Sequence, residues 1–263
     1  MRSRIARFLL PVSLFCTLLA SGAVLPECGT ASGTRFNLEP RRDPVPQNET
    51  AVDFLPGSGL SGGDLVVGGA NDFRLLTSGT GTPGDFRGVF GMSNQTGYYV
   101  HRNGAAGNPC SPDFEGGFPS LKNPNNNDTV VGVGDPAIVA DPARQVFFFA
   151  DERVGLGELF DSAIAVFRST AATLNNSSSC PAGTHTDAQA RSCWPTSILV
   201  DIGTIFSTFD IRPNLALDER ADGGGVGAGD LYVSAARASA PSIFIAACRN
   251  DLASCSPSVK ISG

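Results

Sequence analysis

The stretch from Gly134 to Val154 decides the fold, reading GDPAIVAD over residues 134–141 and QVFFFADERV over residues 145–154. Each contains an apolar run of about five residues, rich in Val, Ile and Phe, which favours strands. The first run ends at an aspartate, and the polar residues between the two runs are typical of a turn. The stretch therefore predicts a short strand, a turn and a longer strand.

The same pattern returns on both sides of this stretch. The short runs are NETAVD (48–53), DPAIVAD (135–141) and RPNLALD (212–218), and the longer ones are DLVVGGANDF (64–73), QVFFFADERV (145–154) and DLYVSAARAS (230–239). Third strands are expected at 96–104, 163–170 and 242–250, and fourth strands at 196–201, at 258–263 and, for the first copy, within 114–133. Residues 162–174 are also interpreted as a β element, despite their alanines.

The spacing of the repeat predicts propeller blades. The aspartates that end the short runs, Asp53, Asp141 and Asp218, lie 88 and 77 residues apart, room for about four strands and their loops. Four-stranded units stacked around an axis are the blades of a β-propeller. The predicted fold is therefore all-β, a partial β-propeller of about three four-stranded antiparallel blades, at about 48–130, 131–209 and 210–263. A β-sandwich is the alternative.

The composition agrees with this class. The chain has 263 residues with 31 Gly and 18 Pro, which destabilise helices, so a helical bundle is excluded. Apolar runs continue to the C-terminus, which argues against disorder. The net charge is −6 and there is no basic stripe with interleaved aromatics, so neither nucleic acid nor an anionic membrane surface is an expected partner.

The N-terminus has the order of a secretory signal. Three arginines precede residue 8, an interrupted apolar stretch covers residues 8–19, and small residues follow at 20–23. We predict cleavage after Ala23, a flexible lead-in over residues 24–47, a secreted product and no membrane insertion after cleavage. A lipoprotein and an uncleaved membrane anchor are the alternatives. Loss of residues 1–23 would change the net charge from −6 to −9.

Six of the seven cysteines follow the predicted signal. An even number of cysteines in an exported chain suggests disulfides. Cys180 with Cys193, and Cys248 with Cys255, would close short loops, which leaves Cys28 with Cys110. Zinc is the alternative, but there is no CxxC motif and the chain has only two histidines.

The opening motifs of the three copies resemble those of sialidase-superfamily propellers, the BNR or Asp-box repeat proteins of bacterial exported type. In such sequences successive blades open with motifs like Asn-Glu-Pro-Ser-Ile-Ala-Val-Asn, Ser-Asp-Pro-Ala-Val-Ala-Tyr-Asp and Asp-Lys-Pro-Trp-Ile-Ala-Val-Asp. The corresponding segments here are 48–53, 134–141 and 211–218, and GGANDFR (68–74) is similar to the run after the first motif. The resemblance covers about residues 48–263.

Two departures from that family matter. The box Ser-x-Asp-x-Gly-x-Thr-Trp is incomplete at its expected positions, HRNGAAG (101–107), FRSTAATL (167–174) and CRNDLASC (248–255). The family's propellers resemble six-bladed wheels, whereas this chain has about three units. An open arc leaves two outer blade faces without neighbours, and these would expose apolar patches. A second propeller half, or a second copy of the chain, is one expected partner.

Candidate site residues are few. The resemblance implies a Tyr nucleophile, a Glu base, an Asp acid and an Arg cluster, but no local motif assigns these roles, so the catalytic residues stay unknown. Tyr98, Tyr99, Tyr232 and Arg212 are interpreted as structural. Asp72 and Arg74, at a strand end, are weak ligand-binding candidates. No cofactor is expected, although Asp218, Asp222 and Asp230, in a Gly-rich loop, could hold Ca²⁺; a solvated turn is the alternative.

The sequence leaves three functions open. The first is a secreted sialidase-like propeller with a binding or scaffold role, with glycans as the expected ligands. The second is an exo-glycosidase of the sialidase type, an exo-alpha-sialidase acting on terminal sialosides. The third is a fragment of a longer protein without a function of its own.

Overall fold

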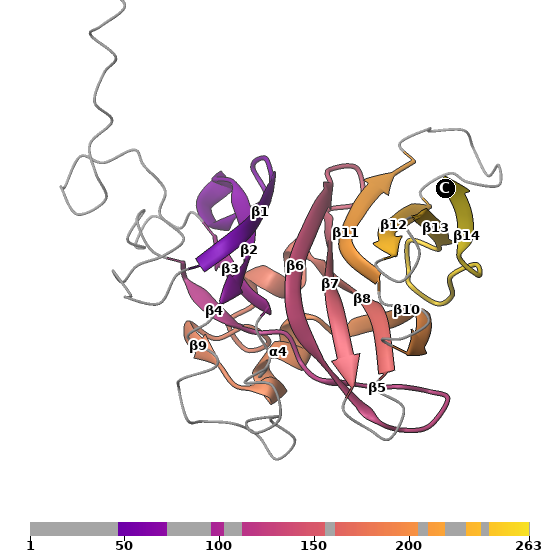
Figure 1. Ribbon diagram of the computed structural model, residues 1–263. Coiled ribbons are helices and arrows are strands. Elements are labelled where there is room, and N and C mark those ends of the chain that lie inside the picture. Colours follow the sequence, from indigo (N-terminus) through magenta and orange to yellow (C-terminus); the bar gives the residue numbers. More distant parts are fainter. Residues whose placement is uncertain are drawn as a thin grey trace, which may run out of the picture.

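The described part of the chain forms three sheets, antiparallel except for the pair β4 and β9 (Figure 1). The computed structural model describes residues 47–72, 96–102, 112–155, 161–204, 210–218, 230–237 and 242–262. Sheet 1 contains β1 (Gln47–Leu55), β2 (Leu65–Asp72), β3 (Thr96–His101), β4 (Phe114–Gly117) and β9 (Gly183–His185). Sheet 2 contains β5 (Leu121–Lys122), β6 (Thr129–Asp141), β7 (Val146–Gly155), β8 (Asp161–Thr170) and β10 (Thr196–Thr204). Sheet 3 contains β11 (Asp210–Leu217), β12 (Leu231–Arg237), β13 (Ser242–Cys248) and β14 (Val259–Ser262).

Each sheet is built around four consecutive antiparallel strands. The orders are β1-β2-β3-β4, β6-β7-β8-β10 and β11-β12-β13-β14, with β9 and β5 added at the edges of sheets 1 and 2. The first strand of each sheet, β1, β6 or β11, lies beside the first strand of the next sheet (Figure 1). This arrangement is that of propeller blades, so the predicted all-β fold of about three four-stranded blades is confirmed. The fourth strands were also predicted correctly, including β4 in the first copy.

Sheet 2 is buried on both faces, and this explains its sequence. One face carries Phe147, Phe149 and Phe167 into a core shared with sheet 1. The other carries Phe148 and Ile164 into a core shared with sheet 3. A strand that is buried on both faces has a continuous apolar sequence, whereas a strand with one exposed face alternates apolar and polar residues. Accordingly all ten residues of β7 are buried, while burial in β12 alternates.

A β-bulge in each first strand corrects the alignment of the three copies. The register shifts between Asn48 and Ala51, between Gly134 and Ala137, and between Ile211 and Asn214. Counted from these bulges, Leu55 is the residue that corresponds to Asp141 and Asp218. The predicted equivalence of Asp53 was therefore wrong by two residues. Asp53 instead bridges two sheets, because its Oδ2 accepts a hydrogen bond from the Ala140 amide at 2.7 Å.

An insertion between β8 and β10, which we call the brace (residues 171–195), joins sheet 2 to sheet 1. It contains α3 (Ala171–Asn175), β9 and α4 (Asp187–Cys193). The helix α3 corrects the prediction of a β element over residues 162–174, since β8 ends at Thr170 and the Thr170 side chain caps α3. The strand β9 pairs in parallel with β4 and thus extends sheet 1.

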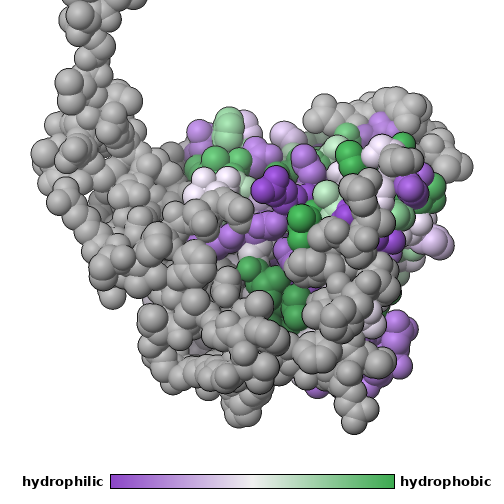
Figure 2. Space-filling model, viewed as in Figure 1, coloured by the Kyte–Doolittle hydropathy of each residue, from purple (hydrophilic) through white to green (hydrophobic). Residues whose placement is uncertain are grey.

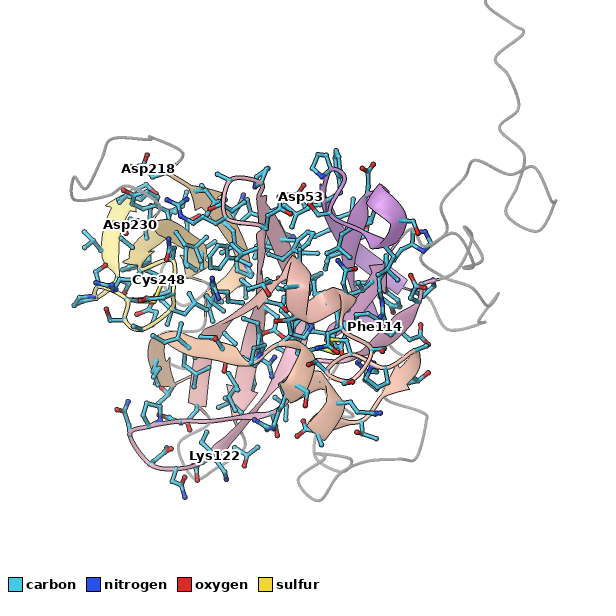
Figure 3. All side chains as sticks on the ribbon, turned by 180° about the vertical axis from the view of Figure 1, so that it is seen from behind. Asp53, Phe114, Lys122, Asp218, Asp230 and Cys248 are labelled. Atoms are coloured by element: carbon cyan, nitrogen blue, oxygen red, sulfur yellow. A yellow bond between two sulfur atoms is a disulfide. The ribbon has the colours of Figure 1, made fainter. Side chains whose placement is uncertain are left out.

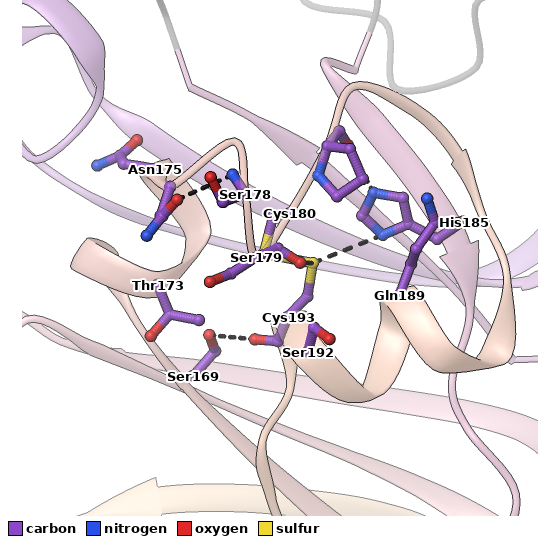
Figure 4. Close-up of a disulfide and its surroundings, with 12 residues drawn as sticks. Ser169, Thr173, Asn175, Ser178, Ser179, Cys180, His185, Gln189, Ser192 and Cys193 are labelled. Carbon is purple, nitrogen blue, oxygen red and sulfur yellow. Dashed lines mark hydrogen bonds between the residues drawn. A yellow bond between two sulfur atoms is a disulfide. The ribbon is translucent and has the colours of Figure 1, made fainter.

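The predicted disulfide between Cys180 and Cys193 lies at the centre of the brace (Figure 4). The carbonyl oxygen of Cys180 accepts a hydrogen bond from Arg102 Nη2, at the end of β3, at 2.8 Å. The carbonyl oxygen of Cys193 accepts one from the Ser169 hydroxyl of β8. The disulfide therefore connects a residue held by sheet 1 to a residue held by sheet 2. The predicted pair Cys248–Cys255 is also present, at the end of β13.

The molecule is hollowed between β1 on one side and β11 on the other (Figures 1 and 2). The strand β6 lies between them, so the first strands of all three sheets border this hollow. Figure 2 shows that hydrophilic and hydrophobic residues both reach this surface. The exposed apolar side chains of β1 are Val52 and Phe54.

We predict that Gly69→Ala weakens the contact between sheets 1 and 2. A Cβ at Gly69 would lie 2.6 Å from Cε2 of Phe149 and 3.0 Å from Cβ of Pro136, closer than packed carbons approach. Overpacking of this kind costs about 1–3 kcal/mol, measured as the free energy of unfolding in urea. The control Ser197→Ala, at an exposed position of β10, should change it by less than about 0.5 kcal/mol. Equal effects of the two substitutions would contradict the tight approach of the sheets.

Candidate ligand-binding site

All three sheets meet at the bulge of β6, which we call the three-sheet junction (Asn71, Asp135 and Arg212). The backbone amide of Asp135 donates a hydrogen bond to Oδ1 of Asn71, in sheet 1, at 2.8 Å. The carboxylate of Asp135 accepts one at Oδ2 from the backbone amide of Arg212, in sheet 3, at 3.0 Å. Asp135 therefore connects the first and third sheets through the second.

Two of the seven described non-glycine residues with positive φ lie at this junction. Asp135 and Arg212 both have φ of 54°, in the left-handed region that residues other than glycine rarely adopt. Both directly precede a proline, Pro136 or Pro213, and occupy corresponding positions of their bulges. A left-handed residue costs about 1–3 kcal/mol and persists only where its surroundings fix it. Strain of this kind is common at functional sites, which makes the junction the candidate site.

The junction brings several kinds of polar group together, and the exposed one is Arg212. Asn71 is almost buried and packs against Gly134, where a Cβ would lie 2.6 Å from Oδ1 of Asn71. Asp135 is half-buried and Arg212 is exposed. Glu152 pairs with Gly134 across the sheet and brings a second, buried carboxylate to the same level of the strands. An amide, carboxylates and a guanidinium group are suited to hydrogen-bonding hydroxyl groups.

A buried ion pair lies beside this level of the strands, between sheets 1 and 2. Nε of Arg153 donates to Oδ1 of Asp151 at 2.7 Å, and both side chains are fully buried. Arg153 also donates to the carbonyl oxygen of Pro119 and lies over the ring of Phe167. Burial raises the pKa of Asp151 from 3.8 to about 6, and the opposing effect of Arg153 offsets only part of this rise.

The structure places few of the sequence-based candidates at the junction. Asp72 follows Asn71 at the end of β2, but its side chain lies outside the described residues, as do Arg74, Asp222, Cys28 and Cys110. Asp218 and Asp230 lie at one end of the molecule, as Figure 3 shows, and the Asp218 amide donates to the Asp230 carbonyl oxygen. In the described ranges no group of three or more His, Cys, Asp or Glu residues is placed to hold a metal ion.

Tyr98 has a structural environment. Its side chain is fully buried, and its hydroxyl lies 2.7 Å from Nδ1 of His185 in the brace. Nε2 of His185 lies 2.6 Å from the carbonyl oxygen of Pro181, to which only a protonated nitrogen can donate. The Tyr98 hydroxyl therefore donates to Nδ1, and burial raises the pKa of Tyr98. Trp194 packs edge-on against the same ring, so Tyr98 holds the brace on sheet 1.

Sequence analysis missed Asn71 and Asp135 as site residues and interpreted Arg212 as structural. Asp-Pro and Arg-Pro do occur at corresponding positions of the second and third copies. This signal does not reveal the site, because a residue before proline is expected to be extended, whereas Asp135 and Arg212 have positive φ. The contact of these residues with Asn71 follows from the stacking of the sheets.

Comparisons with known proteins add little. No family model matches the chain, and no curated protein matches it. A solved structure titled as a GH43 β-1,3-galactosidase matches with a TM-score of 0.34 and 12% sequence identity, over 75% of this chain and 33% of that one. A similarity this low supports no conclusion about fold or function. The described residues contain no helix that is long and apolar enough to cross a membrane.

We predict that Asp135→Ala destabilises the protein more than Asp135→Asn. Alanine is strained in the left-handed conformation, and it has no oxygen to accept the hydrogen bond from the Arg212 amide. The free energy of unfolding should therefore fall by about 2 kcal/mol. Asparagine tolerates this conformation and keeps a side-chain oxygen, so its effect should stay below about 1 kcal/mol. Urea denaturation measures both, and equal losses would contradict the role of Asp135.

We predict that Asp151 makes stability depend on pH between about 4 and 6. Its pKa is higher in the folded protein than in the unfolded chain, so the folded state binds more protons in this window. The free energy of unfolding should therefore decrease as pH rises from 4 to 6. Asp151→Asn should lower stability, because Arg153 loses its partner, and should also remove this slope. An unchanged slope in that variant would assign the dependence to another group.

Proposed function

We propose that the chain is an exported, non-catalytic, sialidase-like propeller module that binds a glycan at the three-sheet junction. The observation that carries the proposal is the convergence of all three sheets on Asp135, with two strained residues held at corresponding positions. The motifs that open each blade support the relationship to the sialidase superfamily. Two disulfides, together with the signal-like N-terminus, support export to an oxidising compartment.

The chemistry of the junction suits sugar hydroxyl groups. A hydroxyl both donates and accepts, so it needs acceptors such as the Asp135 carboxylate and donors such as the exposed Arg212 guanidinium. The bulges fix the backbone of both residues before any ligand arrives. When a site is preorganised, less free energy is lost in ordering its residues as the ligand binds.

The test is binding of the purified full chain to a glycan array, followed by titration of the best ligand. Arg212→Ala should weaken binding about tenfold or more, because a charged hydrogen bond contributes about 1.5–3 kcal/mol. The matched control is Arg144→Ala, which removes an arginine from the turn between β6 and β7, nine residues after Asp135. The Arg144→Ala variant should bind the same glycan with the affinity of the unaltered protein.

Two outcomes would contradict the proposal. If the folded protein binds no glycan on the array, glycans are not its ligands. Release of the fluorophore from a fluorogenic sialoside would show hydrolysis, and would favour the exo-glycosidase instead of a non-catalytic module.

A further inference from the structure

Three buried polar side chains enter the core between sheets 1 and 2 from opposite sides. Asp151 and Arg153 lie two and four residues after Phe149 on β7, so they point to the same face of sheet 2, toward sheet 1. Thr96 lies two residues before Tyr98 on β3, so it points toward sheet 2. All three side chains are fully buried, and no solvent reaches them from the surface.

The ion pair between Asp151 and Arg153 leaves one polar atom of each partner unused. Nε of Arg153 donates to Oδ1 of Asp151, and Nη1 of Arg153 donates to the carbonyl oxygen of Pro119 at 3.0 Å. An arginine and a carboxylate can form two parallel hydrogen bonds, but this pair forms one. Among the residues that the structure describes, Nη2 of Arg153 and Oδ2 of Asp151 have no hydrogen-bond partner.

The hydroxyl group of Thr96 is a third polar group of this kind at the same place. Burial raises the pKa of Asp151, and the Thr96 hydroxyl is, after Arg153, one of the groups that oppose this rise, so it lies near that carboxyl group. Its orientation nevertheless gives Oγ1 no hydrogen-bond partner in the described ranges. Buried polar atoms in native proteins are nearly always paired, either with protein atoms or with ordered water.

The three atoms require a ligand that both donates and accepts hydrogen bonds. A guanidinium nitrogen only donates, a carboxylate oxygen only accepts, and a hydroxyl group does either. The charges of Asp151 and Arg153 already offset each other, so an ion at this place would be buried without a partner of opposite charge. Water is the small neutral molecule with both capacities, and a buried water typically makes about three hydrogen bonds.

We propose that Thr96, Asp151 and Arg153 form a binding site for one buried water molecule. The water accepts a hydrogen bond from Nη2 of Arg153, donates one to Oδ2 of Asp151 and forms a third with the Thr96 hydroxyl. Because Thr96 belongs to sheet 1 and the ion pair to sheet 2, the water joins the two sheets. Thr96 pairs with Asn71 across β2 and β3, so this site lies beside the three-sheet junction, and it does not depend on glycan binding there.

The first test is a crystal structure of the full chain, at a resolution that shows ordered water. We expect a water molecule within hydrogen-bonding distance of Nη2 of Arg153, Oδ2 of Asp151 and Oγ1 of Thr96. A direct hydrogen bond between Nη2 and Oδ2, with no density between the side chains, would overturn the proposal. A direct hydrogen bond from the Thr96 hydroxyl to Asp151 would overturn it as well.

The second test is the sign of a stability change, measured as the midpoint of unfolding in urea. Thr96→Val removes the hydroxyl group and keeps the shape of the side chain. If the hydroxyl binds the water, valine leaves that water with one partner fewer, and the midpoint should fall. If the hydroxyl were unpaired in the folded protein, its removal would end an unfavourable burial, and the midpoint would rise.

Thr196→Val is the matched control, because Thr196 is half-buried at the start of β10 and its hydroxyl group is not one of the buried atoms without a partner. This variant should not lower the midpoint, whereas Thr96→Val should lower it. A midpoint that rises in Thr96→Val, or that changes equally in both variants, would overturn the proposal. The crystal structure of the unaltered protein decides the same question without relying on either variant.

Discussion

The fold depends on a sheet that is covered on both sides. The phenylalanines of β7 alternate between two cores, so that Phe147 and Phe149 pack toward sheet 1 and Phe148 packs toward sheet 3. Burial of a phenylalanine side chain contributes about 1.5–3 kcal/mol, so these contacts are a large part of what holds three separate sheets together. Sheets 1 and 3 each share one core with sheet 2, and their positions depend on how closely they approach it.

The same stacking produces the candidate site. The three residues of the junction come together where the first strands run side by side, and there the bulges of β6 and β11 each turn a backbone amide toward the neighbouring sheet. Asp135 donates a hydrogen bond to sheet 1 and accepts one from sheet 3, because its strand lies between these two sheets. The strain at Asp135 and Arg212 is tolerated because the hydrogen bonds and the stacked sheets fix both residues from more than one side.

Much of the fold could be predicted from the sequence, and less of the site. Strands such as β7 and β13 are local apolar runs, so their composition and flanking turns indicate them. The register of the copies could not be counted correctly, because a bulge adds a residue to one strand without a clear sequence mark. This is why Asp53, rather than Leu55, was aligned with Asp141. The brace was missed for a similar reason, since β9 pairs with a strand more than sixty residues earlier.

The brace also affects how the molecule comes apart. Sheets 1 and 2 share a core and are tied together by a disulfide-closed loop, whose two ends are held by Arg102 on one side and Ser169 on the other. No such loop joins sheet 3 to sheet 2 in the described residues, where packing and a few polar contacts hold it. Partial opening should therefore begin at the C-terminal sheet, whose amide hydrogens would exchange with solvent first, while the two N-terminal sheets unfold as one cooperative unit.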